Sequence, residues 1–128
     1  MRVIFFRLKA SCPSVGLTSG FISGGTESFD VELSDWMTRA SDNKKARLTG
    51  LCNILGLKYP PDLSLRYQLF HRTASALITA QTFKTDIAIM LVHSFSQNQA
   101  WFEDYAAFAK ALGIKAPKRG IFQKIETR

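Results

Sequence analysis

The most regular hydrophobic pattern of the chain lies between Leu65 and Ser96. Residues 65–83 have helical periodicity, with apolar positions recurring three or four residues apart. A continuous apolar run, Ile87 to Val92, follows and is closed by His93. Six apolar residues without alternation are typical of a strand that is buried on both faces. The pattern therefore predicts a layered α/β domain with this strand at its centre.

Two further helices and their ends can be predicted from capping signals. Ser41 or Asp42 can begin a helix that carries an apolar stripe and ends at Gly56, a residue suited to a left-handed C-cap. Ser64 can cap the helix of residues 65–83. A helix after Ser96 has its own apolar stripe and ends at Gly113. The stripe residues are Leu48, Leu51, Cys52 and Leu55 in the first helix, and Trp101, Tyr105, Phe108 and Leu112 in the last.

The two ends of the chain differ in how well they are patterned. Gly120 to Ile125 is typical of a short strand, and with the strand of residues 87–92 and the helix between them it predicts a right-handed parallel βαβ unit. Val3 to Leu8 predicts an edge strand, because it is β-branched and aromatic but carries a basic residue. Residues 11–28 are rich in Gly and Ser and predict a loop or a loosely held hairpin.

These elements predict one α/β domain over residues 1–128. Its small sheet, which includes the parallel βαβ unit, is packed by three or four helices. Residues 1–28 form an atypical strand plus a Gly/Ser-rich loop, and residues 29–128 form the well-patterned core. A chain of this length buries enough surface to fold without disulfides or a metal.

Charge and cysteine content narrow the classes of function. The net charge is +7; residues 1–64 hold eight Lys/Arg against six Asp/Glu, and residues 65–128 hold nine against four. The basic excess permits attraction to nucleic acid but does not define a site. Cys12 and Cys52 form no zinc or redox motif, and no apolar stretch is long enough for a signal peptide or a membrane helix. We expect a soluble cytoplasmic protein without membrane contact.

A polar stripe on the helix of residues 65–83 is the candidate site. Its side chains recur at helical spacing and share one face; with His93 at the end of the following strand, they form a candidate surface for binding a ligand or nucleic acid. Arg and Gln suit phosphate, carboxylate and amide contacts. The alternative is that His71 and Arg72 are anchored by their own neighbours at the edge of the core. The stripe residues are Gln68, His71, Arg72, Ser75 and Thr79.

The residues provide weaker grounds for chemistry. Two histidines without a matched cysteine or carboxylate make a poor zinc site, and no serine lies in a nucleophile motif. Asp30, Glu32 and Asp35 invite a metal interpretation, but a short helix over residues 33–39 would place acids in its first turn, where the helix dipole favours them. We therefore predict no catalytic residue, no metal ligand and no cofactor.

Three segments resemble the carboxy-terminal part of a bacterial family of domain-of-unknown-function proteins. They are Leu65–Ala76, Met90–Ser96 and Trp101–Phe108, within a similarity that extends from Glu27 to about Leu112. Members of that family look like PD-(D/E)xK nuclease folds, in which two acids hold a divalent metal that activates water and a lysine assists the attack.

The resemblance implies a restriction-endonuclease-like remnant that lacks the cleavage centre. Its Glu-x-Lys positions fall at about residues 22–24, where the sequence has neither the acid nor the lysine. We therefore expect a non-catalytic binding or interaction module that contacts nucleic acid or a partner protein. The alternative is a metal-dependent nuclease that uses Asp30, Glu32 and Asp35 as relocated carboxylates. If strands of the family's sheet are missing, an exposed edge would pair with a second copy, so we also expect a homodimer.

Overall fold

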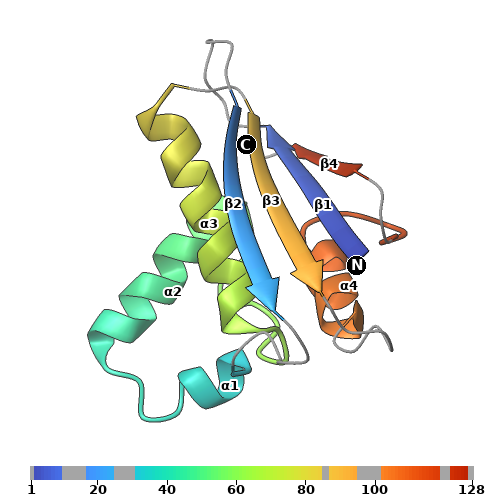
Figure 1. Ribbon diagram of the computed structural model, residues 1–128. Coiled ribbons are helices and arrows are strands. Elements are labelled where there is room, and N and C mark those ends of the chain that lie inside the picture. The colour runs from blue at the N-terminus through green and yellow to red at the C-terminus, as the bar shows by residue number, and fades with distance from the viewer. Residues whose placement is uncertain are drawn as a thin grey trace.

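The computed structural model describes residues 2–9, 17–24, 31–84, 87–94, 102–118 and 122–126. These residues form a mixture of helices and strands (Figure 1). In chain order the elements are β1 (Arg2–Lys9), β2 (Leu17–Gly24), α1 (Leu33–Trp36), α2 (Asp42–Leu55), α3 (Tyr67–Thr82), β3 (Ile87–Ser94), α4 (Phe102–Ala111) and β4 (Phe122–Glu126).

The strands form one mixed sheet in the order β2-β3-β1-β4. β3 pairs in parallel with β2 and antiparallel with β1, with Met90 opposite both Gly20 and Phe6. β1 pairs in parallel with β4 on its other side. The apolar run is therefore an interior strand, as its sequence predicts.

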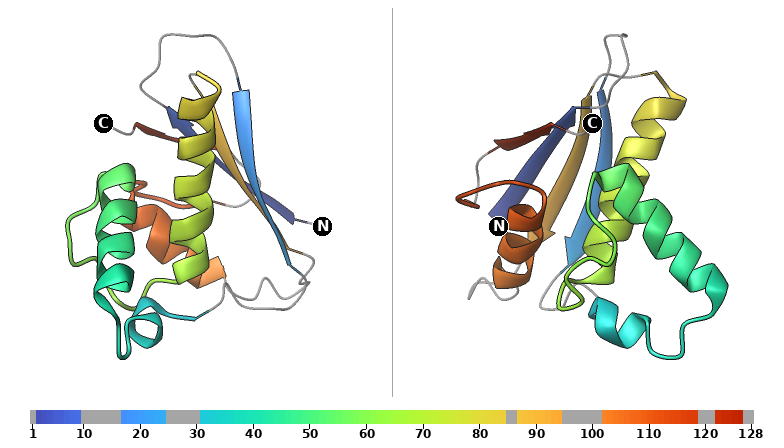
Figure 2. Two further views of the ribbon diagram at one scale, coloured as in Figure 1. Left: turned by 90° about the vertical axis from the view of Figure 1, so that its left-hand side faces the viewer. Right: turned by 180° about the vertical axis from the view of Figure 1, so that it is seen from behind.

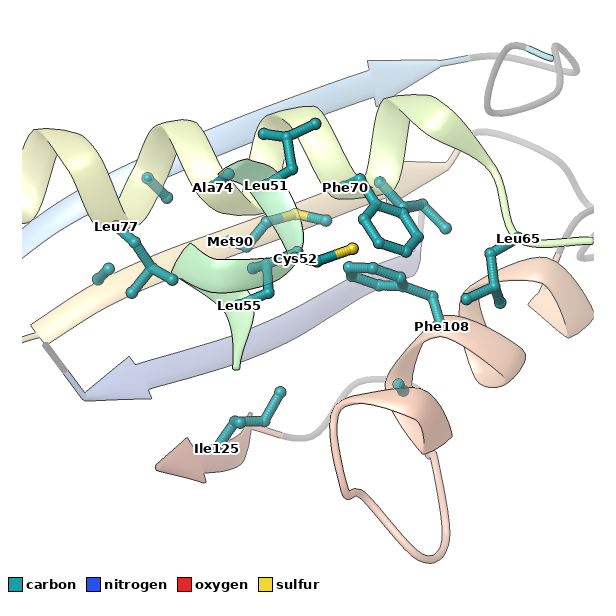
Figure 3. Close-up of a cluster of buried hydrophobic side chains, with 14 of the residues drawn as sticks. Leu51, Cys52, Leu55, Leu65, Phe70, Ala74, Leu77, Met90, Phe108 and Ile125 are labelled. Atoms are coloured by element: carbon teal, nitrogen blue, oxygen red, sulfur yellow. The ribbon is translucent and has the colours of Figure 1, made fainter. Parts of the chain in front are cut away.

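The described helices lie on one face of this sheet (Figure 2). α3 packs on β2 and β3, and α2 packs on α3. The core between the layers is filled by buried side chains from the helices, β3 and β4 (Figure 3). The rings of Phe70 and Phe108, 5.1 Å apart, join α3 to α4. Among the described residues, no helix combines the length and apolar character needed to span a bilayer.

α2 confirms its prediction in full. Ser41 is the N-cap, and its hydroxyl accepts a hydrogen bond from the Lys44 backbone N–H at 3.4 Å. Gly56 is the C-cap, with a left-handed φ of 70°. All four predicted stripe residues are buried. The local signals were sufficient here because both helix ends are set by residues within the segment.

Three predictions about the sheet are wrong. The predicted βαβ unit does not form between β3 and β4, because β1 lies between them and the two strands run in opposite directions. β1 is consequently an interior strand and not an edge. Residues 17–24 form β2, which pairs with β3, although their sequence predicts a loop or a loosely held hairpin; this pairing overrides the weak strand preference of the Gly and Ser residues.

The start of α3 also differs from its prediction. Ser64 does not cap the helix; its hydroxyl and backbone N–H both donate to Asp62 Oδ1, at 2.8 and 2.9 Å. α3 begins at Tyr67 because the preceding residues are extended and pair with the chain before α1, through an isolated bridge between Glu32 and Arg66. Leu65 is still buried, but as part of this extended segment.

β3 is covered on only one of its faces by the described elements. Ala88, Met90 and Val92 are fully buried beneath the helices. The alternate residues Ile87, Ile89 and Leu91 are only partly buried, and no described helix lies on their side of the sheet (Figure 2). The prediction that β3 is buried on both faces therefore holds for one face of the described structure.

Candidate functional site

The predicted polar stripe lies on the side of α3 that faces away from the sheet. His71 and Arg72 are exposed, and Gln68, Ser75 and Thr79 are partly buried. The opposite side of α3 is buried against the sheet and the neighbouring helices. The helix thus separates a packing side from a polar side, and we call Gln68, His71, Arg72 and Ser75 the α3 surface.

Two hydroxyl groups of the stripe are bound to the helix itself. Ser75 Oγ donates to the His71 carbonyl oxygen, and Thr79 Oγ1 donates to the Ser75 carbonyl oxygen, both at 2.8 Å. Such bonds to the preceding turn are common for Ser and Thr in helices. The Ser75 proton is therefore engaged with the backbone and not with a histidine base, as a nucleophile would require.

A row of stacked rings leads from α1 to the α3 surface. The rings of Trp36 and Tyr67 stack with centroids 4.4 Å apart and planes at 12°, and those of Tyr67 and His71 are 5.9 Å apart at 21°. The Lys44 ammonium lies 5.2 Å from the centroid of the Trp36 ring and donates to the Trp36 carbonyl oxygen at 3.2 Å. This row ties α1, α2 and α3 together and supports the imidazole of His71.

The sequence alone does not indicate the whole row. Neither Trp36 nor Tyr67 belongs to the stripes that the helical pattern indicates. The separation of Tyr67 and His71 by four residues was the one local signal, since side chains at that spacing meet on a helix. No signal in the sequence around Trp36 indicates that its ring reaches Tyr67. This contact depends on the bridge between Glu32 and Arg66, which pairs the segments that precede α1 and α3.

Arg66 has a structural role beside the α3 surface. Its Nε donates to Asp104 Oδ2 at 3.1 Å, and its Nη2 lies 3.9 Å from Glu32 Oε1. The arginine side chain is 17% exposed, so the pair with Asp104 is shielded in part from water. The ion pair between Arg66 and Asp104 fixes the start of α3 against α4. Arg72, the arginine within α3, is exposed.

The acidic residues do not assemble a metal centre within the described part of the chain. Glu32 is paired with Arg66, and Asp35 lies in the first turn of α1, consistent with the dipole interpretation. Asp30 lies outside the described residues. No group of three or more potential metal ligands was found among the residues that are described.

His93 is not brought together with the α3 surface. Its backbone lies near the end of β3, paired with Val3 of β1 and Ser23 of β2. By the alternation of a strand, position 93 belongs with Ile89 and Leu91 on the sheet face away from α3. Its role in binding stays a prediction.

The sequence was also compared with known proteins. A family model described as a domain of unknown function (DUF6946) matches residues 24–128. No curated protein and no solved structure matches the chain at a significant level. The matched residues include α1 to α4, β3 and β4, while β1 and all of β2 except Gly24 lie before them.

Proposed function

The chain belongs to the DUF6946 family, and we propose that it is a non-catalytic binding module that recognises a phosphate-bearing ligand, nucleic acid in the first place, through the α3 surface. The observation that carries the proposal is the stacked row that ends at His71. It holds an imidazole beside the exposed Arg72 on a helix that is anchored to the sheet.

The chemistry of the α3 surface suits an oxyanion. Arg72 presents a planar set of donors that matches phosphate geometry, and His71 adds a donor one position away. Gln68 lies on the same side of the helix and offers its amide to either a base or a phosphate, whereas Ser75, whose proton is bound to the His71 carbonyl oxygen, offers only an acceptor, which suits a base. Lys44 and Lys45, exposed in the first turns of α2, extend the positive charge beyond α3.

We propose further that the module derives from a nuclease-like fold whose cleavage centre is absent. The positions at which the resemblance places Glu-x-Lys, residues 22–24, lie at the end of β2 and pair with β3. The residues at these positions are Ile, Ser and Gly, so they supply neither the acid nor the lysine of a cleavage centre. The pairing of Glu32 with Arg66 gives no support to relocated carboxylates.

The test is binding of fluorescent single-stranded and double-stranded oligonucleotides, followed by anisotropy over a series of salt concentrations. We expect binding that weakens with salt, and Arg72→Ala should weaken it roughly tenfold and reduce the salt dependence by about one phosphate contact. Lys110→Ala is the control, because Lys110 is an exposed cation on α4. It should change the affinity little.

Three results would overturn the proposal. The first is the absence of salt-dependent binding to every oligonucleotide. The second is an equal loss of affinity in Arg72→Ala and Lys110→Ala, which would reflect net charge and not the α3 surface. The third is cleavage of the oligonucleotide with Mg²⁺ or Mn²⁺ that is lost in Glu32→Ala, which would favour the nuclease alternative.

We propose, finally, that the protein acts as a homodimer. The predicted basis was an edge left exposed by missing strands of the family's sheet, but the central strand β3 is paired on both edges, with β2 and β1 of the same chain. Support now comes from the other face of the sheet, whose partly buried apolar residues face away from the described helices.

A further inference from the structure

The row of stacked rings reaches solvent at His71. Trp36 and Tyr67 are partly buried, whereas His71 is exposed. Among the described residues, the ring stacked on the imidazole is that of Tyr67, with the two centroids 5.9 Å apart. The imidazole is therefore the exposed end of a stack whose other two rings are held within the fold.

Hydrogen bonds hold the row in position before any ligand binds. The Tyr67 backbone N–H donates to the Val31 carbonyl oxygen at 3.1 Å, which fixes the start of α3 to the segment before α1. The Lys44 ammonium donates to the Trp36 carbonyl oxygen at 3.2 Å, which fixes the end of α1 to α2. Trp36 and Tyr67 therefore have little freedom left to lose when a further ring stacks on His71, and such preorganisation lowers the entropic cost of binding.

A cation lies next to the exposed ring. Arg72 follows His71 directly in α3 and is also exposed. Successive side chains of a helix project about 100° apart, so the guanidinium group lies to one side of the imidazole. A ligand that joins a flat ring to a phosphate through a short linker would contact both residues at once, and a nucleotide has this composition.

We infer that the imidazole of His71 is a stacking platform for an unpaired base of a single-stranded nucleic acid, whose phosphates are contacted by Arg72. The inference rests on the proposed function and names the class of nucleic acid. In a duplex the neighbouring base pairs cover both faces of each base, so only an unpaired base offers a face to a protein ring. Stacking of this kind accepts every base, so we expect little sequence preference.

The charge of the neighbouring helix favours a strand over a free nucleotide. Lys45 and Arg47 are exposed on α2, which packs on α3. A strand presents several phosphates to such a surface, whereas a mononucleotide presents its phosphate at one point only. A strand with one base on His71 therefore gains attraction from cations that a mononucleotide does not reach.

The experiment measures the affinity of the full chain for four labelled oligonucleotides of equal length by fluorescence anisotropy. They are oligothymidylate, oligouridylate, a duplex and a fully abasic strand, which keeps the phosphates but has no bases. Wild type should bind the two base-bearing single strands about fivefold or more tightly than the abasic strand, because this ratio measures the base stack. Whichever of the two binds more tightly identifies the ligand as DNA or RNA.

Three variants separate stacking from charge. His71→Ala should remove the preference for base-bearing strands and leave the affinity for the duplex nearly unchanged. His71→Phe keeps a ring but has no hydrogen-bond donor, and it should retain the preference. Arg72→Ala should weaken binding to every strand and also retain the preference, because it removes a phosphate contact.

Phe83→Ala is the matched control for the loss of an exposed ring. Phe83 is 70% exposed at the C-cap of α3 and lies outside the stacked row, so its substitution should leave the preference unchanged. Circular dichroism shows whether each variant is folded. The comparison of base-bearing and abasic strands on the wild-type chain needs no variant, so it answers the question even if a substitution disturbs the fold.

The remaining outcomes would overturn the inference. Salt-dependent binding that does not distinguish base-bearing from abasic strands would retain the proposed function but not the stack. An equal loss of preference in His71→Ala and His71→Phe would assign His71 to hydrogen bonding, and an equal loss in His71→Ala and Phe83→Ala would mean that any exposed ring serves. Displacement of the strand by an equal nucleotide concentration of thymidine monophosphate would assign the site to a mononucleotide. Absence of binding to every strand would overturn the proposed function as well.

Discussion

Replacing Thr73 with valine is expected to stabilise the fold. Thr73 lies on the packing side of α3 and is fully buried. Its Oγ1 has no hydrogen-bond partner among the described residues. Valine has nearly the same shape, so Thr73→Val removes a buried polar group without opening a cavity or crowding the core.

The expected gain follows from the desolvation of the hydroxyl. Leaving a buried donor or acceptor unpaired costs about 1–3 kcal/mol. Thr and Val have similar helix propensities, so the backbone contributes little to the difference. Allowing for structure in the unfolded chain, we expect the free energy of unfolding to rise by about 1–2 kcal/mol, and Tm by roughly 3–10 °C for a domain of this size.

The assay is urea denaturation followed by circular dichroism, with Thr79→Val as the control. Thr79 is on the same helix and is partly buried, but its Oγ1 donates to the Ser75 carbonyl oxygen at 2.8 Å. Loss of that bond should leave stability unchanged or lower it by about 0.5–1.5 kcal/mol. The two substitutions are chemically identical, so opposite signs would isolate the effect of the unpaired hydroxyl.

The reasoning would be refuted if Thr73→Val destabilised the protein while Thr73→Ser did not. This pattern would mean that the hydroxyl is satisfied by a group such as a buried water, and that its removal leaves that group unpaired. An unchanged m-value is required for the comparison, because a change would signal a different unfolded state.

Two further predictions concern the core and its pH dependence. Phe108→Ala should lower the free energy of unfolding by about 3–5 kcal/mol in urea denaturation, because Phe108 is fully buried against Phe70, whereas Ile78→Ala, at a 45% exposed position, should cost much less; equal losses would contradict this account of the core. Burial raises the pKa of the Cys52 thiol and of the Tyr105 phenol above their ordinary values of 9.0 and 10.0. Because the folded state holds these protons more tightly, stability should fall as the pH rises above about 9, and Tyr105→Phe should weaken that fall in thermal melts at pH 8 to 11; a variant with the wild-type pH profile would contradict the role of Tyr105.

The sequence predicted the elements whose signals are local. α2 follows from Ser41, its apolar stripe and Gly56, all within one segment. β3 follows from its own residues, because a continuous apolar run of six residues indicates a buried strand without knowledge of the strands that pair with it. By contrast, β2 is a strand only because β3 pairs with it, and the start of α3 is set by the bridge between Glu32 and Arg66. Such distant pairings leave no periodic signal in the residues themselves.

The candidate site also combines features that local sequence signals indicate with features that depend on distant contacts. Helical spacing was enough to place Gln68, His71, Arg72 and Ser75 on one side of α3. The contribution of Trp36 and the structural role of Arg66 depend on contacts between segments far apart in the chain. Sequence therefore indicated which residues share the surface, but not which groups hold them in place.

The interior position of β1 has a consequence for the order of folding. β1 is made before every other described element, yet its two neighbours are β3, which follows all of the described helices except α4, and β4, which comes after α4. Pairings between residues so far apart close large loops, which slows folding. During synthesis β1 must stay unpaired until β3 has emerged, and its other edge stays unpaired until β4 has emerged. The nascent chain therefore exposes an aggregation-prone strand until β3 and β4 have been made.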